Sequence, residues 1–129
     1  MTVTYLDTSA ALKLLVEEDE SQALVDSLTS GGPRRLVSSW LLHTELHFAA
    51  GRRPEIADLA NVATVLGAVD LVDLSRGDFL AAGTLSPLRS HDALHLAVAI
   101  RLGADELLTY DAELQRAAAR TGIAVLAPA

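Results

Sequence analysis

Two acidic residues follow directly on short apolar runs that have the composition of buried strands. Asp7 comes after residues 3–6, and Asp111 comes just after residues 106–109. Each is also well placed to cap the helix expected after it, because aspartate accepts hydrogen bonds from the first free N–H groups of a helix. These acids therefore have two interpretations, as helix caps or as members of a site at the edge of a sheet.

Two further acids interrupt apolar stretches that should be helical. Glu45 has Leu41 and Phe48 about one turn away, so its carboxylate falls within the face expected to pack on the core. Asp92 precedes residues 93–100, which are apolar on nearly all sides. An unpaired buried carboxylate is costly or shifts its pKa. Each of these acids therefore needs an arginine partner, a capping role or a cation.

The four acids predict metal-dependent chemistry if the fold brings them together. Close carboxylates repel one another, and Lys13 is the only lysine in the chain. Mg²⁺ or Mn²⁺ removes that repulsion, since both ions prefer carboxylate and water ligands. A bound cation activates water and neutralises charge on a phosphate, and two cations about 4 Å apart serve both the attacking and the leaving oxygen. The predicted reaction is phosphodiester hydrolysis.

The elements that must position these acids alternate along the chain. Strands are expected at residues 3–6, 35–38, 68–74, 106–109 and 123–126, and helices at 10–16, 21–28, 40–50, 55–66, 75–84, 89–102 and 111–120. This alternation predicts an α/β fold, a three-layer sandwich with a central, mainly parallel sheet flanked by helices. Such sheets bind ligands at the carboxyl ends of their strands. We expect residues 1–129 to form a single domain.

Composition excludes several classes of function. The chain has 129 residues, half of them hydrophobic, and no cysteine, so it has no disulfides, zinc–thiolate site or cysteine nucleophile. Its net charge of −7 argues against coating nucleic acid through a basic surface, although acids that hold cations are compatible with a nuclease. Neither a membrane span nor a signal peptide is recognised. We therefore expect a cytoplasmic protein with no membrane partner.

The acids lie in segments that resemble those of the PIN-domain ribonucleases, and specifically the VapC toxins of type II toxin–antitoxin pairs. The matching segments are residues 5–10, 44–46, 90–97 and 108–114. Each segment is short, but their order and spacing extend over nearly the whole chain. The resemblance implies a PIN-like fold in which Asp7, Glu45, Asp92 and Asp111 form the catalytic metal site.

The resemblance also implies individual roles. Asp7 and Asp92 would be the main direct ligands of Mg²⁺ or Mn²⁺. Glu45 and Asp111 would bind metal directly or through water, or would orient the attacking water. The hydroxyls of two further residues would support the site, and these are Ser9 and Thr109.

An activity and partners follow from the same resemblance. The family cuts RNA endonucleolytically, its members usually dimerise, and a cognate VapB antitoxin blocks the cleft. The chain is therefore expected to be a toxin that cleaves RNA, such as a structured tRNA or rRNA loop. Several arginines and the tryptophan are candidates for RNA contacts or for solvated surface positions. They are Arg34, Arg35, Arg52, Arg53, Arg89 and Trp40.

Three other functions compete with this interpretation. His91 and His95 have the spacing of the H-E-x-x-H zinc motif, but aspartate replaces its glutamate, and His95 suits a packed or site-supporting position better. An acid-cluster phosphatase of the aspartyl-phosphate type has a second aspartate where this chain has Ser9. The third alternative is a catalytically silent PIN-like module that binds RNA or protein, which the intact set of acids argues against.

Overall fold

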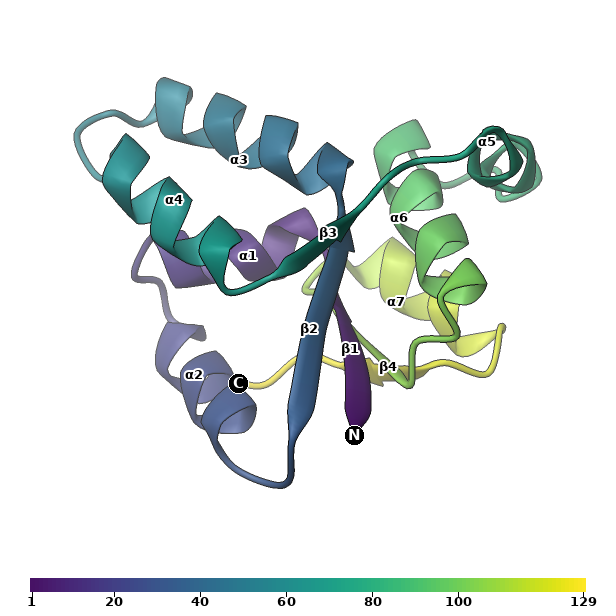
Figure 1. Cartoon of the computed structure of the whole chain (residues 1–129), viewed down its shortest axis with the longest axis horizontal. Coiled ribbons are helices and arrows are strands. Elements are labelled where there is room, and N and C mark those ends of the chain that lie inside the picture. The colour runs from purple at the N-terminus through teal and green to yellow at the C-terminus, as the bar shows by residue number, and fades with distance from the viewer.

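The structure, a computed structural model, describes all of residues 1–129 and has a five-stranded sheet at its centre (Figure 1). The strands are β1 (Thr2–Leu6), β2 (Arg34–Ser39), β3 (Asp70–Val72), β4 (Glu106–Leu108) and β5 (Ala124–Leu126). They lie in the order β3-β2-β1-β4-β5, and every neighbouring pair is parallel. The predicted α/β sandwich around a parallel sheet is therefore confirmed.

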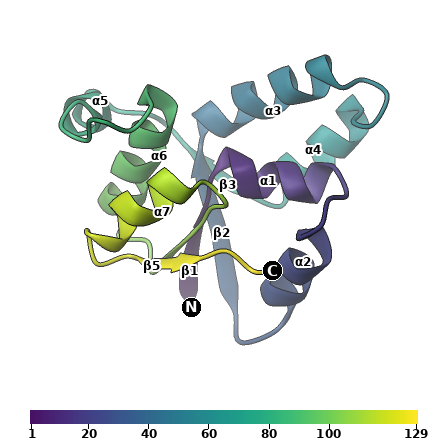
Figure 2. The same cartoon turned by 180° about the vertical axis from the view of Figure 1, so that it is seen from behind.

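Helices connect successive strands and cover both faces of the sheet. They are α1 (Thr8–Leu15), α2 (Ser21–Thr29), α3 (Trp40–Arg52), α4 (Leu59–Gly67), α5 (Arg76–Ala82), α6 (Ser90–Arg101) and α7 (Ala112–Ala119). The first four helices gather on one side of the sheet, and α5, α6 and α7 gather on the other (Figures 1 and 2). No helix combines the length and the apolar character that crossing a membrane requires.

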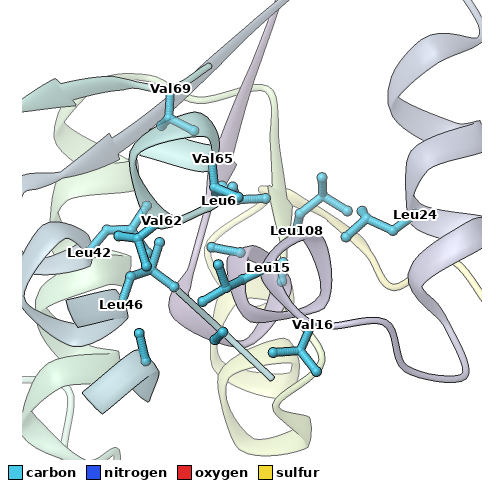
Figure 3. Packing of buried hydrophobic residues seen from close by; sticks show 14 residues of the cluster. Leu6, Leu15, Val16, Leu24, Leu42, Leu46, Val62, Val65, Val69 and Leu108 are labelled. Carbon is cyan, nitrogen blue, oxygen red and sulfur yellow. The ribbon is translucent and has the colours of Figure 1, made fainter. Parts of the chain in front are cut away.

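The sheet separates two hydrophobic cores. Leu6 and Leu108 belong to the core beneath the first four helices (Figure 3), whereas their neighbours Tyr5 and Leu107 belong to the core beneath α6 and α7. Successive side chains of a strand point to opposite faces, so the central strands are buried on both sides. This is why the consecutive residues Tyr5 and Leu6 are both apolar.

The register of the two central strands brings distant acids towards one edge. Leu6 of β1 pairs with Leu108 of β4, and the backbone N–H of Asp7 donates to the carbonyl of Leu108 at 3.2 Å. Because the strands are parallel, both chains leave the sheet at the same end. Asp7 and Thr109, about one hundred positions apart in sequence, are therefore neighbours at the carboxyl edge of the sheet.

The helix expected at residues 55–66 begins later than predicted. Residues 54–56 form a turn, and α4 starts only after Asp58, whose side chain accepts a 2.8 Å hydrogen bond from the N–H of Asn61. The cap, rather than Pro54, fixes the start of this helix. The third strand is also shorter than the predicted 68–74, since only residues of β3 pair with β2.

Replacement of Leu46 by alanine tests the core beneath α1 to α4. Leu46 is fully buried among the side chains of this core. We expect Leu46→Ala to lower the free energy of unfolding by about 2–5 kcal/mol, because a cavity remains where the side chain was. Leu80→Ala is the matched control, since Leu80 is exposed on α5, and its effect should stay within about 0.5 kcal/mol. Urea unfolding measures both, and equal effects would contradict the assigned packing.

Candidate functional site

Six elements carry or flank the predicted site residues, and all of them meet near the carboxyl edge of the central strands. Asp7 follows β1 and caps α1, and Asp111 follows β4 and caps α7. Glu45 lies in α3, and Asp92 lies in the first turn of α6. The capping role of both strand-end acids is confirmed, and the second oxygen of each carboxylate makes a different contact, with Thr109 for Asp7 and with Arg89 for Asp111.

Asp7 is the most deeply buried of the four acids, with 2% of the residue exposed. Its Oδ1 accepts the N–H of Ala10 at 3.0 Å, and its Oδ2 accepts the hydroxyl of Thr109 at 2.6 Å. The Ser9 hydroxyl lies 2.8 and 3.0 Å from the two oxygens. All these partners are neutral donors, and no lysine or arginine pairs with this carboxylate.

Thr109 joins the two strand-end acids. Its hydroxyl donates to Asp7, and its oxygen accepts the backbone N–H of Asp111 at 3.1 Å. The Ser9 oxygen similarly accepts the backbone N–H of Tyr110 at 2.8 Å. The hydroxyls of Ser9 and Thr109 therefore connect the segment after β4 to the segment after β1 by hydrogen bonds.

Arg89 connects the other pair of aspartates. Its Nε lies 3.3 Å from Asp92 Oδ2, and its Nη2 lies 3.0 Å from Asp111 Oδ2. The Arg89 side chain is 64% exposed, whereas Asp92 is buried. An exposed guanidinium thus supplies the positive charge between Asp92 and Asp111. Ser90 begins α6 instead of capping it, and no side chain caps this helix.

Glu45 is held by a hydrogen-bond network that reaches into the core. Its Oε1 accepts the Thr8 hydroxyl at 2.6 Å and lies 2.8 Å from His95 Nε2, while its Oε2 makes no hydrogen bond. A carboxylate only accepts, so His95 carries a proton on Nε2. In the neutral ring Nδ1 is then an acceptor, and it takes the Tyr5 hydroxyl at 2.7 Å. His95 is buried and links α6 to β1 and α3.

The surroundings of the acids shift their pKa values in different directions. Burial raises the pKa of Asp7, with hydrogen bonds from Thr109 and other donors opposing the shift. Burial also raises the pKa of Asp92, and the negative charge of Asp111 adds to the effect against His91 and Arg89. Burial acts in the same sense on Glu45, but its hydrogen bond and charge interaction with His95 lower the pKa overall.

The types of donor atom in the candidate site suit a hard divalent cation, but the distances between the side chains do not yet form a metal site. Asp7 is a buried carboxylate with no cationic partner, and Glu45 keeps one oxygen free, so carboxylate oxygens are available. However, no group of three Asp, Glu or His side chains is close enough to form a metal cluster. Asp92 and Asp111 are bound to Arg89 instead, so a cation there requires displacement of that guanidinium.

The other residues singled out in the sequence lie in different places. Arg34 pairs with Glu106 at 3.0 Å, and Arg35 pairs with Asp70 at 2.8 Å. Both arginines belong to the first half of β2, away from the carboxyl edge. Two others, Arg52 and Arg53, and the half-exposed Trp40 lie at the two ends of α3. The structure does not bring these six candidates for RNA contact to one surface.

Thr8 and Tyr5 are the contributors to the site that the sequence did not reveal. Tyr5 is a core residue, and Thr8 is the first residue of α1, whose cap is Asp7. The available signal was their position on either side of Leu6 and Asp7. A hydroxyl next to a site acid, at the end of a buried strand, is well placed for a second contact.

Comparison with known proteins gives the family. The PIN domain family model matches residues 4–120. The chain is 42% identical to the protein named ribonuclease VapC46 of Mycobacterium tuberculosis over 99% of both chains, and 38% identical to ribonuclease VapC35 of the same species over 96% of both. The chain therefore belongs to the PIN domain family, within its VapC ribonucleases.

Solved structures show the same fold at low sequence identity. The structure of VapBC2 from Rickettsia felis bound to a DNA fragment from their promoter matches with a TM-score of 0.73 and 14% identity, over 97% of this chain and 98% of that one. Mycobacterium tuberculosis VapC20, described as a sarcin-ricin loop cleaving toxin, matches with a TM-score of 0.70 and 16% identity, over 88% and 94% of the two chains.

Replacement of Asp7 by asparagine tests the electrostatic cost of the site. Because burial raises the pKa of Asp7, the folded protein binds a proton more tightly than the unfolded chain, and stability falls as pH rises between the two pKa values. Asp7→Asn removes this loss and retains a good capping residue. We expect its Tm, in metal-free buffer, to exceed that of the wild type by a few degrees at pH 7.

The gain should disappear on acidification, below the pKa of the unfolded aspartate, where Asp7 is protonated in both states. Thermal unfolding by circular dichroism between about pH 3 and pH 8 measures the difference. A stabilisation that does not depend on pH would show that the charge of Asp7 is not its cause.

Proposed function

We propose that this protein is a Mg²⁺- or Mn²⁺-dependent endoribonuclease. The observation that supports the proposal most directly is the meeting of Asp7, Glu45, Asp92 and Asp111, from four separate segments, at the carboxyl edge of the sheet. Membership of the VapC ribonucleases supports RNA as the substrate. The identity of the cut RNA is a separate question, and tRNA and rRNA loops are the candidates.

Each acid contributes differently to such a site. Asp7 is fixed by Thr109 and Ala10, and Asp92 is buried at the start of α6, and these two carboxylates are the proposed main ligands of the metal. Glu45 presents its free Oε2 while Thr8 holds the other oxygen. Asp111 completes the set opposite Asp92. The chemistry that a bound divalent cation supplies here is activation of water and neutralisation of charge on the phosphate.

A toxin role and its partners belong to the same proposal. A structure described as a toxin–antitoxin complex from Klebsiella pneumoniae and the structure of VapBC2 from Rickettsia felis share the fold. Together with the VapC relatives they support a cognate VapB-type antitoxin that inhibits this protein. We also propose that the protein forms a homodimer and acts in the cytoplasm, where tRNA and rRNA are found.

Sequencing of RNA 5′ ends tests the nuclease. Total RNA from the source organism is treated with purified, antitoxin-free protein in Mg²⁺ or Mn²⁺, and in chelator. We expect new ends at one or a few sites, absent in chelator, and a loss of at least about a hundredfold with Asp92→Asn, since the variant removes a carboxylate of the site. The position of the new ends identifies the substrate.

Asp19→Asn is the matched control for Asp92→Asn. Asp19 is exposed, lies in the loop after α1 and forms no ion pair, so its replacement changes the net charge equally without touching the site. It should cleave like the wild type. Cleavage by folded Asp92→Asn at the wild-type rate would contradict the metal-site assignment. No new ends with the folded wild type would favour a module that binds RNA or protein without cutting it.

We further propose that His95 is a positioning residue for Glu45. Two substitutions separate its contacts, because the amide nitrogen of glutamine takes the place of Nε2 and that of asparagine the place of Nδ1. His95→Gln therefore keeps a donor towards Glu45, and His95→Asn does not. We expect kcat to fall about tenfold or more in His95→Asn and to be largely retained in His95→Gln, at similar KM.

Thermal unfolding of the two variants is the accompanying control, since each loses the same buried ring. If the loss of kcat is proportional to the loss of Tm in both variants, His95 is only a structural residue and the positioning role is wrong. A selective rescue by glutamine at matched stability supports the contact between Nε2 and Glu45.

A further inference from the structure

A groove next to the acidic edge is lined by side chains that the proposed reaction does not use. It has a volume of about 360 Å³ and lies between α7 and the loop of residues 84–88. The loop leads directly into Arg89, and Asp111 caps the start of α7. Arg89 and Asp111 form the ion pair described above. The groove therefore has one end, at Leu88 and Glu113, close in sequence to this ion pair.

Two arginines without ion-pair partners line this groove. Arg116 on α7 and Arg120, directly after its last residue, are both exposed, and neither has a carboxylate within 4.0 Å. By contrast, Arg34, Arg35 and Arg101 are each paired with an acid. Residues four apart on a helix face the same way with about 5–6 Å between their Cβ atoms. The groove therefore presents two guanidinium groups side by side in a protein of net charge −7.

Hydrogen-bond acceptors are interspersed with these cations. The hydroxyls of Thr84 and Thr121 already donate to backbone carbonyls, each at 2.7 Å, so towards a ligand their oxygens act as acceptors. The Glu113 carboxylate, at the end nearest Asp111, is another acceptor, and the Ser86 hydroxyl is free to donate or to accept. A ligand that fits carries both anionic oxygens and hydroxyl donors.

We propose that this groove binds the sugar–phosphate backbone of the RNA strand beside its cleavage site. Arg116 and Arg120 contact phosphates, for which the guanidinium is well suited. The acceptor oxygens receive ribose 2′-hydroxyls, which RNA has and DNA lacks. An acidic peptide would also satisfy the arginines, but it does not carry a hydroxyl donor beside each anionic group, as RNA does. The inference rests on the proposed ribonuclease function and adds to it a route for the substrate out of the acidic site.

Binding of a labelled, mixed-sequence single-stranded RNA tests the groove. The measurement uses Asp92→Asn protein with Mg²⁺, so that binding is observed without cleavage, at several salt concentrations. Arg116→Ala and Arg120→Ala should each raise Kd about threefold or more and reduce the slope of log K against log salt by about 0.7, the contribution of one phosphate contact. DNA of the same sequence should bind more weakly than RNA.

Arg35→Ala is the matched control, since it removes one exposed arginine from the opposite end of the sheet. Its Kd should stay within about twofold of the Kd of the Asp92→Asn protein, and its salt slope within about 0.2, because no phosphate contact is lost. Arg116→Lys keeps the charge and should retain most of the slope.

The proposal is overturned if the two alanine variants bind RNA like Arg35→Ala, which would leave the groove to a protein ligand. It is also overturned if RNA and DNA bind equally and the variants weaken both alike. These results are independent of cleavage by the wild type. A protein that cuts RNA but binds it without Arg116 and Arg120 retains the proposed function and loses the groove.

Discussion

The burial of the Asp7 carboxylate at the end of the central strand is the constraint on which the site depends. A carboxylate among apolar strands is tolerated only when its oxygens are satisfied. Here Ala10, Ser9 and Thr109 satisfy them, and these donors come from the next helix and from the neighbouring strand. The same hydrogen bonds therefore stabilise the charge and fix the positions of β1, α1 and the chain after β4.

The remaining acids are arranged around this fixed point with different degrees of freedom. Glu45 is held through the buried His95, so its position is coupled to the core through Tyr5. Asp92 and Asp111 are connected only by Arg89, whose exposed side chain can leave without disturbing the core. One half of the site is rigid, and the other half is closed by a charge that an incoming cation or phosphate is able to displace.

Charge is also distributed unevenly over the rest of the protein. Lys13 and several arginines form ion pairs with nearby carboxylates, and Arg89 forms ion pairs with two aspartates of the candidate site. An overall net charge of −7 thus conceals a local surface on α7 where Arg116 and Arg120 stay unpaired. A nucleic acid meets the field of that surface, which is why total charge is a poor guide to whether a protein binds RNA.

The sequence by itself determined the fold class, and it singled out the four acids of the candidate site. Alternation of strand-like and helical segments implies a parallel sheet, and Asp7 and Asp111 follow strands whose carboxyl ends share an edge. Glu45 and Asp92 were visible because they interrupt apolar stripes. These patterns are local, because they depend on the spacing of side chains along a single helix or strand. They can therefore be recognised without knowledge of the strand order.

Only the tertiary structure decided how those residues are connected. The contacts of His95 with Tyr5 and Thr8 link residues about ninety positions apart, and nothing local distinguishes His95 from a packed histidine. The pairing of Arg89 with Asp111 and the groove beside Arg116 arise where α6, α7 and a loop pack together. Such contacts depend on the order of the strands and the packing of the helices, which sequence periodicity does not specify.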